Sequence, residues 1–117
     1  MVRLNTDIGA VSVDSAVFTN IVGHAATNCF GVKGMVVRSM TDGLVHLLRR
    51  EAMGKGVKVT FHDDNSISID LHIMVDKGVN LRAIGSSIIS EVRYNVAKST
   101  GTVVRTVNVF IDSITPD

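Results

Sequence analysis

Two stretches of the chain alternate between apolar and polar residues, and this alternation predicts a β-hairpin. In residues 57–62, VKVTFH, and 66–75, SISIDLHIMV, every second position is apolar, as in strands that bury one face. The residues between them, Asp-Asp-Asn at 63–65, are typical of a tight turn. We therefore expect antiparallel strands in which His62 lies opposite Ser66 and Lys58 lies opposite Asp70.

A helical spacing of apolar residues predicts two amphipathic helices. The first follows Asp14, a suitable N-cap, and ends at Gly31; the second begins at Asn80 and stops before Gly101. Gly85 lies within the second apolar stripe, where we expect the helix and the sheet to approach closely. The stripes comprise Val17, Phe18, Ile21, Val22, Ala25 and Cys29 in the first helix, and Leu81, Ile84, Gly85, Ile88, Ile89, Val92 and Val96 in the second.

The remaining patterns complete a single α+β domain over residues 1–117. The pattern of residues 8–13 predicts a first strand, and that of residues 103–111 predicts a last one. Segment 35–56 is interpreted as an insert, forming either a helix of one to three turns or a partly mobile excursion. The order is then βαββαβ, with two helices on one face of a four-stranded sheet in a two-layer sandwich. Ferredoxin-like folds have this order.

The last predicted strand is apolar on both of its faces. Valine and isoleucine side chains occupy one face, whereas Val104 and Phe110 occupy the other. Helices on one side of a sheet cover only one face, and a strand apolar on both sides needs cover on both. We therefore expect a second copy or a partner protein to cover Val104 and Phe110. The alternative is that the insert or the chain terminus folds over them.

The charge of the chain is nearly balanced but unevenly distributed. Hydrophobic residues make up 45% and charged residues 20%, and the net charge is +1. This composition is typical of a folded globular domain and argues against binding nucleic acid through bulk charge. Between residues 33 and 58, however, basic residues outnumber Asp42 and Glu51 by six to two. They are Lys33, Arg38, Arg49, Arg50, Lys55 and Lys58.

The sequence gives no indication of catalysis, of a cofactor or of a metal site. Cys29 and His24 are roughly 140° apart on one helix, so they cannot pair as nucleophile and base. His62, Asp70 and His72 share the polar face of the hairpin. The two histidines are nevertheless roughly 20 Å apart at ~3.3 Å per residue, too far for one zinc ion.

The single cysteine and the distribution of polar residues favour a cytoplasmic protein. Cys29 is the only cysteine, which excludes an internal disulfide and suits a reducing compartment. No signal peptide is predicted at the start of the chain. The longest uncharged run, residues 15–32, contains Asn20, His24, Thr27 and Asn28, and these polar residues argue against a membrane span.

Gly31 and Gly34 form a G-x-x-G motif around Lys33, and the motif has two interpretations. It is either the loop with which a KH module clamps a nucleic-acid backbone or the end of the first helix, with Gly31 as C′ residue. A KH loop joins two helices, whereas residues 35–37, MVV, are β-prone. We favour the helix end and keep a nucleic-acid-binding module, using this loop and the basic segment 33–58, as the alternative.

Taken in order and at their spacing, several segments resemble the alkaline shock protein family of Gram-positive bacteria, also called the envelope stress response family. These are GAVSVDSAVFTNIVGHAA, GVKGM, DGLVHLLRRE, GKGVKV, ISIDLHIMVDKGVNL and VVRTVNVFIDSI. The segments AATNCFGVKGM and LLRREAMGKGVKV most resemble the small member encoded beside a dihydroxyacetone-kinase-like protein. The chain departs from better-known members in lacking long charged extensions at both ends.

The resemblance implies a non-enzymatic structural or adaptor protein with a role in cell-envelope homeostasis. It also implies self-association, no cofactor, and contact with a dihydroxyacetone-kinase-like or membrane-anchored protein partner. Access to the membrane then depends on that partner. Combined with the patterns above, we expect an interaction surface that includes Val104, Phe110, Arg49 and Arg50.

Overall fold

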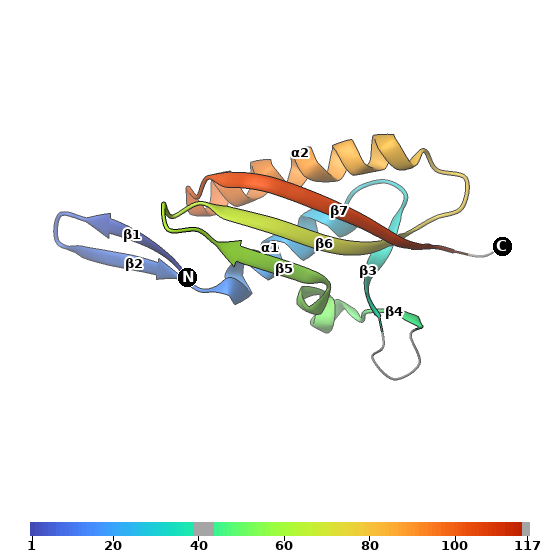
Figure 1. The fold of residues 1–117 in the computed structure, drawn as a ribbon, viewed down its shortest axis with the longest axis horizontal. Helices are drawn as coiled ribbons and strands as arrows, with labels where there is room; N and C mark the ends of the chain where they lie inside the picture. The colour runs from blue at the N-terminus through green and yellow to red at the C-terminus, as the bar shows by residue number, and fades with distance from the viewer. Residues whose placement is uncertain (39–43, 116–117) are drawn as a thin grey trace.

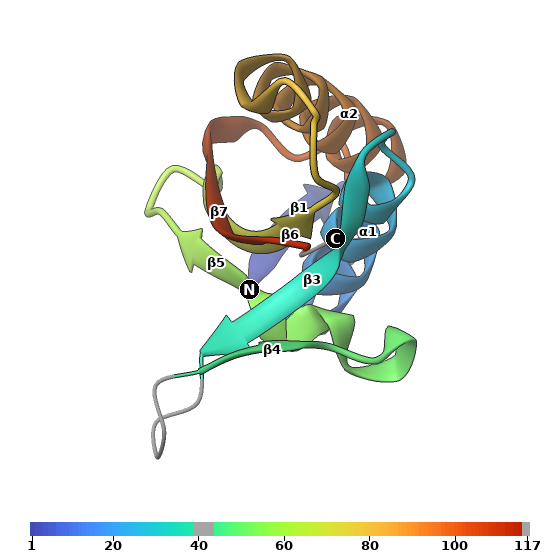
Figure 2. The same ribbon diagram turned by 90° about the vertical axis from the view of Figure 1, so that its right-hand side faces the viewer.

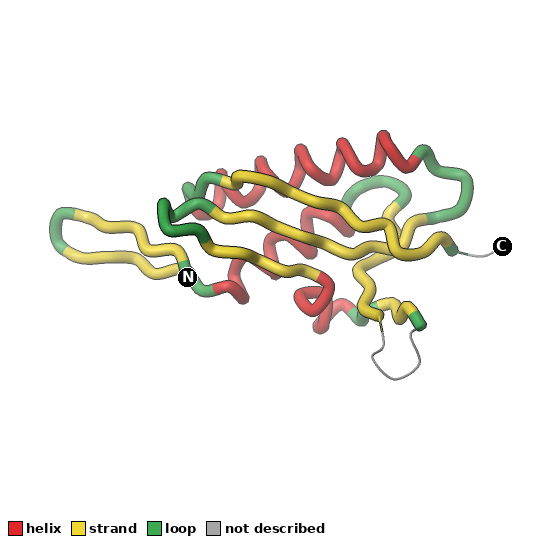
Figure 3. The backbone as a smooth tube through the Cα atoms, in the orientation of Figure 1, coloured by secondary structure: helices red, strands yellow, loops and turns green. Residues whose placement is uncertain are grey.

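The computed structural model describes residues 1–38 and 44–115, and the side chains of Arg50 and Glu51 lie outside that description. It confirms the α+β class (Figures 1 and 3). The elements in chain order are β1 (Val2–Thr6), β2 (Gly9–Val13), α1 (Ser15–Thr27), β3 (Val32–Arg38), β4 (Val45–Leu47), the 3₁₀ helix η1 (Arg50–Gly56), β5 (Val57–Phe61), β6 (Ile67–Val75), α2 (Leu81–Thr100) and β7 (Val104–Ile114).

Strand β6 organises the main sheet. It pairs with β7 in parallel along its whole length, and with both β5 and β3 in antiparallel. A strand has only two edges, so β5 and β3 must share the edge opposite β7, one after the other. The strand β4 extends β3 to complete a five-stranded sheet.

The alternation predicted for the hairpin is confirmed and builds the core. Every second side chain of β6 is fully buried, on the face that both helices cover (Figure 2). Lys58 lies in register with Asp70, and the His62 N–H donates to the Ser66 carbonyl over 2.9 Å. In Figure 1 the opposite, open face of the sheet is towards the viewer and α1 lies behind it.

The predicted helix starts are confirmed. Asp14 accepts a hydrogen bond from the Ala16 N–H and Asn80 accepts one from the Ala83 N–H, as N-cap side chains do. The second helix ends at Gly101 in the left-handed conformation, φ +70°. The prediction for Gly85 is wrong: a Cβ atom there would meet nothing within 4 Å, so helix and sheet do not touch at this point.

The first helix is shorter than predicted. It ends at Thr27 with Asn28 as C-cap, not at Gly31. Gly31 does have a positive φ, +88°, but it lies in the turn that follows the helix. The hydrogen bond from the Val32 N–H to the Cys29 carbonyl closes that turn.

The strand predicted at residues 8–13 forms as β2 but does not join the main sheet. It pairs with β1, which the sequence reasoning missed, in a separate two-stranded sheet that projects beyond the rest of the fold (Figure 3). The side chain of Asn65 ties this hairpin to the β5–β6 turn, because it hydrogen-bonds both the N–H and the carbonyl of Arg3.

The described part of residues 35–56 contains strand residues as well as the short helix that was expected there. Residues 32–38 form β3, which pairs with β6 in the main sheet, whereas the strand predicted at residues 8–13 lies in the separate one. Residues 45–47 form the short strand β4, and the helix that forms in this segment is η1. Within residues 1–38 and 44–115, no helix combines the length and the apolar character needed to cross a bilayer.

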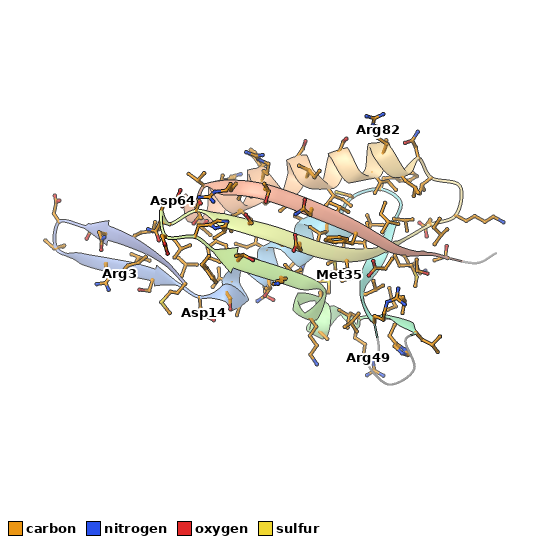
Figure 4. The ribbon with its side chains drawn as sticks, viewed as in Figure 1. Arg3, Asp14, Met35, Arg49, Asp64 and Arg82 are labelled. Atoms are coloured by element: carbon orange, nitrogen blue, oxygen red, sulfur yellow. The ribbon has the colours of Figure 1, made fainter. Side chains whose placement is uncertain are left out.

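The β5–β6 turn holds a carboxylate whose ionisation stabilises the fold. Asp64, placed at this turn in Figure 4, accepts hydrogen bonds from the hydroxyl and the N–H of Ser66 and pairs with Arg105 over 3.0 Å. The Ser66 bonds first, and then Arg105, lower the pKa of Asp64 from 3.8 to about 2. A depressed pKa contributes stability that is complete above the unfolded value and is lost as the pH falls through the folded one.

We expect the D64N variant to unfold at a lower temperature than the wild type at pH 7. The difference in Tm should shrink as the pH falls from about 4 to about 2, because the wild-type carboxylate then becomes protonated. Thermal unfolding of both proteins by circular dichroism at several pH values measures this. A Tm difference that stays constant down to pH 2 would contradict the prediction.

Candidate functional site: a hollow at a fork in the sheet

The main sheet divides at His72, in the middle of β6. Pairing with β5 stops at Leu71 and pairing with β3 starts at Ile73, which leaves His72 between the two ladders on this edge. Beyond Met35, β3 turns away from β6 (Figure 2). A hollow of about 440 Å³ opens at this fork. Its lining comes from β3, η1, β5, β6 and β7, so the fork brings together residues that are distant in sequence.

The imidazole of His72 is held in place by two residues of β7. Its ring stacks on that of Phe110, with ring centroids 4.8 Å apart and planes inclined by 14°. Its Nδ1 lies 2.9 Å from Oδ2 of Asp112. An ionised carboxylate only accepts hydrogen bonds, so Nδ1 carries the proton and donates it. Nε2 is therefore the ring nitrogen that Asp112 does not engage.

A β-bulge in β7 brings Asp112 to this position. The register passes from Ile73 paired with Ile111 to Met74 paired with Ser113, so Asp112 is an extra residue in β7. Bulges of this kind redirect a side chain and occur next to functional sites. The result is that Phe110 and Asp112, both on β7, contact the same histidine.

Three of the six basic residues of segment 33–58 line the hollow. They are Arg38 at the end of β3, Lys55 in η1 and Lys58 in β5. Lys33 lines a separate hollow of about 320 Å³ between α1 and β3. Arg49 is exposed at the N-cap of η1 (Figure 4) and is not among the lining residues. For Arg50, proposed with it, the side chain is outside the described part of the chain.

A glycine permits the close packing beside the hollow. A Cβ atom on Gly56 would lie 3.0 Å from the Val36 carbonyl oxygen and 3.2 Å from Cβ of Met35. A side chain at this distance from a backbone atom would require β3 to shift by a few tenths of an ångström. Glycine at this position therefore lets the end of η1 run directly against β3.

The G-x-x-G motif does not have the geometry of a KH loop. It joins α1 to a strand, not to a second helix. A Cβ atom on Gly31 would lie 2.7 Å from Cδ1 of Ile84, and one on Gly34 would lie 2.9 Å from Cδ1 of Leu47. Both glycines therefore lie where a side chain would crowd a neighbour, and the loop follows the end of α1 without joining it to a second helix.

The predicted interaction surface is only partly on the open face. Val104 is 5% exposed and belongs to the core, so its assignment to the surface is wrong. The reason is a second bulge: the register passes from Ile67 with Val104 to Ser68 with Thr106, which turns Val104 towards the helices. Phe110 is on the open face and 44% exposed, as predicted.

The other candidate residues take separate partners. His62 lies 2.7 Å from the Ser68 hydroxyl, and Asp70 accepts a hydrogen bond from the Asn108 amide. Burial raises the pKa of the Cys29 thiol, which is the inert, buried group that the sequence suggested. The residue that sequence reasoning missed is Asp112, since the predicted strand stopped at residue 111.

A model of the alkaline shock protein 23 family, which has a cell envelope-related function, matches residues 3–116. The chain belongs to this family. The uncharacterized Streptococcus pyogenes protein Spy1614 is 33% identical over 114 residues, covering 97% of this chain and 93% of that protein. The uncharacterized Bacillus subtilis protein YloU is 29% identical over 114 residues, covering 97% and 94%. Membership of the alkaline shock protein 23 family confirms the family resemblance seen in the sequence.

Solved structures with a related fold include MamM-CTD 215-293. It covers 86% of this alkaline shock-type chain and 99% of that one, with a TM-score of 0.51 and 17% identity. The manganese form of MamM CTD E289D has a TM-score of 0.50 and 18% identity, covering 86% and 99%. At this identity the likeness concerns the fold alone.

Proposed function

We propose that this member of the alkaline shock protein 23 family is a non-enzymatic adaptor of the cell envelope that works by self-association through the outer edge of β7. The cell envelope-related function of the family supports the setting. The observation that supports this mechanism is the unpaired outer edge of β7. Among the described residues, this eleven-residue strand pairs with β6 alone, so its other edge is open.

The central part of the open edge lacks the features that normally prevent strands from pairing between molecules. Natural edge strands are protected by lysines, prolines, bulges or a short length. The two bulges of β7 lie near its ends, between the partners of Ile67 and Ser68 and between those of Ile73 and Met74. The regular stretch between them, residues 106–111, is TVNVFI and has neither charge nor proline.

The surroundings of this edge suit a second copy of the chain. Antiparallel pairing of two β7 strands about a twofold axis at Asn108 places Val107 opposite Val109 and Thr106 opposite Phe110, a self-complementary arrangement. A hollow of about 430 Å³ runs between this edge and α2. It receives side chains readily because Gly85 leaves open space on the helix.

Further partners follow from the resemblance seen in the sequence. We infer a cytoplasmic protein that reaches the membrane through a membrane-anchored partner or that scaffolds a dihydroxyacetone-kinase-like protein. The arginine at position 49, exposed beside η1, is available for such contacts when the β7 edges are paired. This role requires no catalytic residue of this chain.

Size-exclusion chromatography with light scattering tests the self-association. We expect the wild type to form a dimer or larger species and the N108K variant to be monomeric, because two lysines then face each other at the twofold axis. Asn20, exposed on α1, provides the control: N20K adds the same charge elsewhere and should keep the wild-type size. A wild type that is monomeric up to high micromolar concentration would contradict the proposal.

A further inference from the structure

We propose that the hollow at the fork of the sheet binds a small organic phosphate. Its charge supports this class of ligand. Arg38, Lys55 and Lys58 contribute three positive charges from three different elements. Among the described residues that line the hollow, Asp112 is the one acidic group. The positive charge of Lys55 and Lys58 suits a phosphate monoester, whose charge at neutral pH is about −1.5 to −2.

The hollow is a consequence of how the backbone is arranged. The ladder on one edge of β6 is interrupted at His72, and β7 carries an extra residue at Asp112. The absence of a side chain at Gly56 allows η1 to pack against β3. The interruption at His72 and the bulge at Asp112 each give up regular pairing, and both residues border the same hollow as Gly56. An ordinary solvated lysine patch requires none of them.

The size and the walls of the hollow favour a phosphate ester over inorganic phosphate. Its volume of about 440 Å³ is in the usual range for sites of small organic ligands, about 300–1,000 Å³. Val37, which is 38% exposed, provides apolar surface beside the basic residues, whereas Val36 and Val57 are buried. The basic side chains would hold the phosphate, and the valine side would contact the organic group.

His72 has the character of a positioned ligand-binding group. The stacked Phe110 ring and the Asp112 carboxylate fix the orientation of the imidazole. Because Nδ1 donates to Asp112, the other ring nitrogen, Nε2, is left to accept a hydrogen bond from a hydroxyl of the ligand's organic group. A histidine that served only to fill the open face would not need two partners from β7, one of them supplied by a bulge.

Isothermal titration and ¹H–¹⁵N spectra of the full chain test the inference. The probes are glycerol 3-phosphate and adenosine 5′-monophosphate, each compared with the corresponding alcohol, and inorganic phosphate. We expect at least one ester to bind more tightly than its alcohol and than inorganic phosphate. The amide shifts should concentrate at residues 36–38, 55–58 and 72. Two further arms use a single-stranded oligonucleotide and vesicles of phosphatidylglycerol.

Charge-neutralising variants locate the site. Replacing Lys55 or Lys58 with glutamine should weaken ester binding by about tenfold or more, since a hydrogen bond to a charged group is lost. Lys33→Gln removes the same charge at the separate hollow and should change nothing. Unchanged thermal unfolding shows that each variant is folded. Because two lysines are tested, the experiment still gives an answer if one of the two variants does not fold.

Several results would overturn the inference. One is that neither ester binds at millimolar concentration, or that each binds no better than its alcohol. Another is binding that K55Q and K58Q leave unaltered. Binding of the oligonucleotide or of the vesicles alone, with no ester bound, would assign the basic residues to a macromolecular surface and also reject a small-molecule site.

Discussion

Replacing Gly31 with alanine is expected to lower the free energy of unfolding by about 2–5 kcal/mol. Two costs add at this position. Gly31 has φ +88°, and the left-handed conformation costs a residue with a side chain about 1–2 kcal/mol. The new Cβ atom would also lie 2.7 Å from Cδ1 of Ile84 and 3.0 Å from Cγ1 of Val79. Overpacking of this kind costs typically about 1–3 kcal/mol.

Gly78 is a matched control for this prediction. It has nearly the same φ, +87°, but a Cβ atom there would meet nothing within 4 Å. The G78A variant should therefore lose only the conformational term, about 1–2 kcal/mol. Urea denaturation of the two variants measures both losses. Equal losses would show that the contact of Gly31 with the start of α2 has no energetic weight.

Replacing Phe18 with alanine is expected to cost about 3–5 kcal/mol of unfolding free energy, the usual range for a buried phenylalanine. Phe18 is 0% exposed. Its ring meets the ring of Phe61 edge to face, with centroids 6.0 Å apart and planes at 69°. The substitution therefore removes a contact between α1 and β5 and also leaves a cavity in the core.

The control for Phe18 is another phenylalanine close to the same helix. Phe30 follows α1 and is 92% exposed, so F30A should change the unfolding free energy by no more than about 0.5 kcal/mol. Chemical denaturation monitored by far-ultraviolet circular dichroism distinguishes the two. A loss below about 1 kcal/mol for F18A would mean that α1 is not anchored to the sheet as described.

The elements that sequence reasoning identified are those whose signals are local. The β5–β6 hairpin was predicted with its register, because its alternation and its turn at residues 63–65 are adjacent in sequence. The second helix was predicted to within a residue, because Asn80 and Gly101 cap its ends. In each case the deciding residues lie inside the element or next to it.

The elements that were missed depend on contacts distant in sequence. The strand β3 shows little alternation because it pairs with β6 only at its beginning and then leaves that strand. The face that Val104 occupies is set by a bulge against Ser68, not by the pattern of its own strand. The candidate site was missed for the same reason, since Asp112 meets His72 across forty residues of sequence.

The charge of the basic segment 33–58 did not by itself identify a binding site. Its composition suggested one surface for a phosphate-rich partner, but the structure divides it between the hollow at the fork, the hollow beside Lys33 and the exposed Arg49. Only the first of these combines positive charge with a fixed histidine and apolar walls. Both the residue pattern and the fold itself were needed to choose among them.

The parallel pairing of β6 with β7 also sets the order in which the protein can complete its fold during synthesis. Ile67 pairs with Val104 and Val75 with Ile114. About forty further residues must therefore be synthesised before a residue of β6 can pair with its partner in β7. At about 5–20 residues per second, that delay is about 2–8 s. Throughout it, the most apolar strand of the chain has one edge without its native partner. The ribosome must therefore synthesise α2 and continue past residue 114 before β6 can pair with all of its native partners.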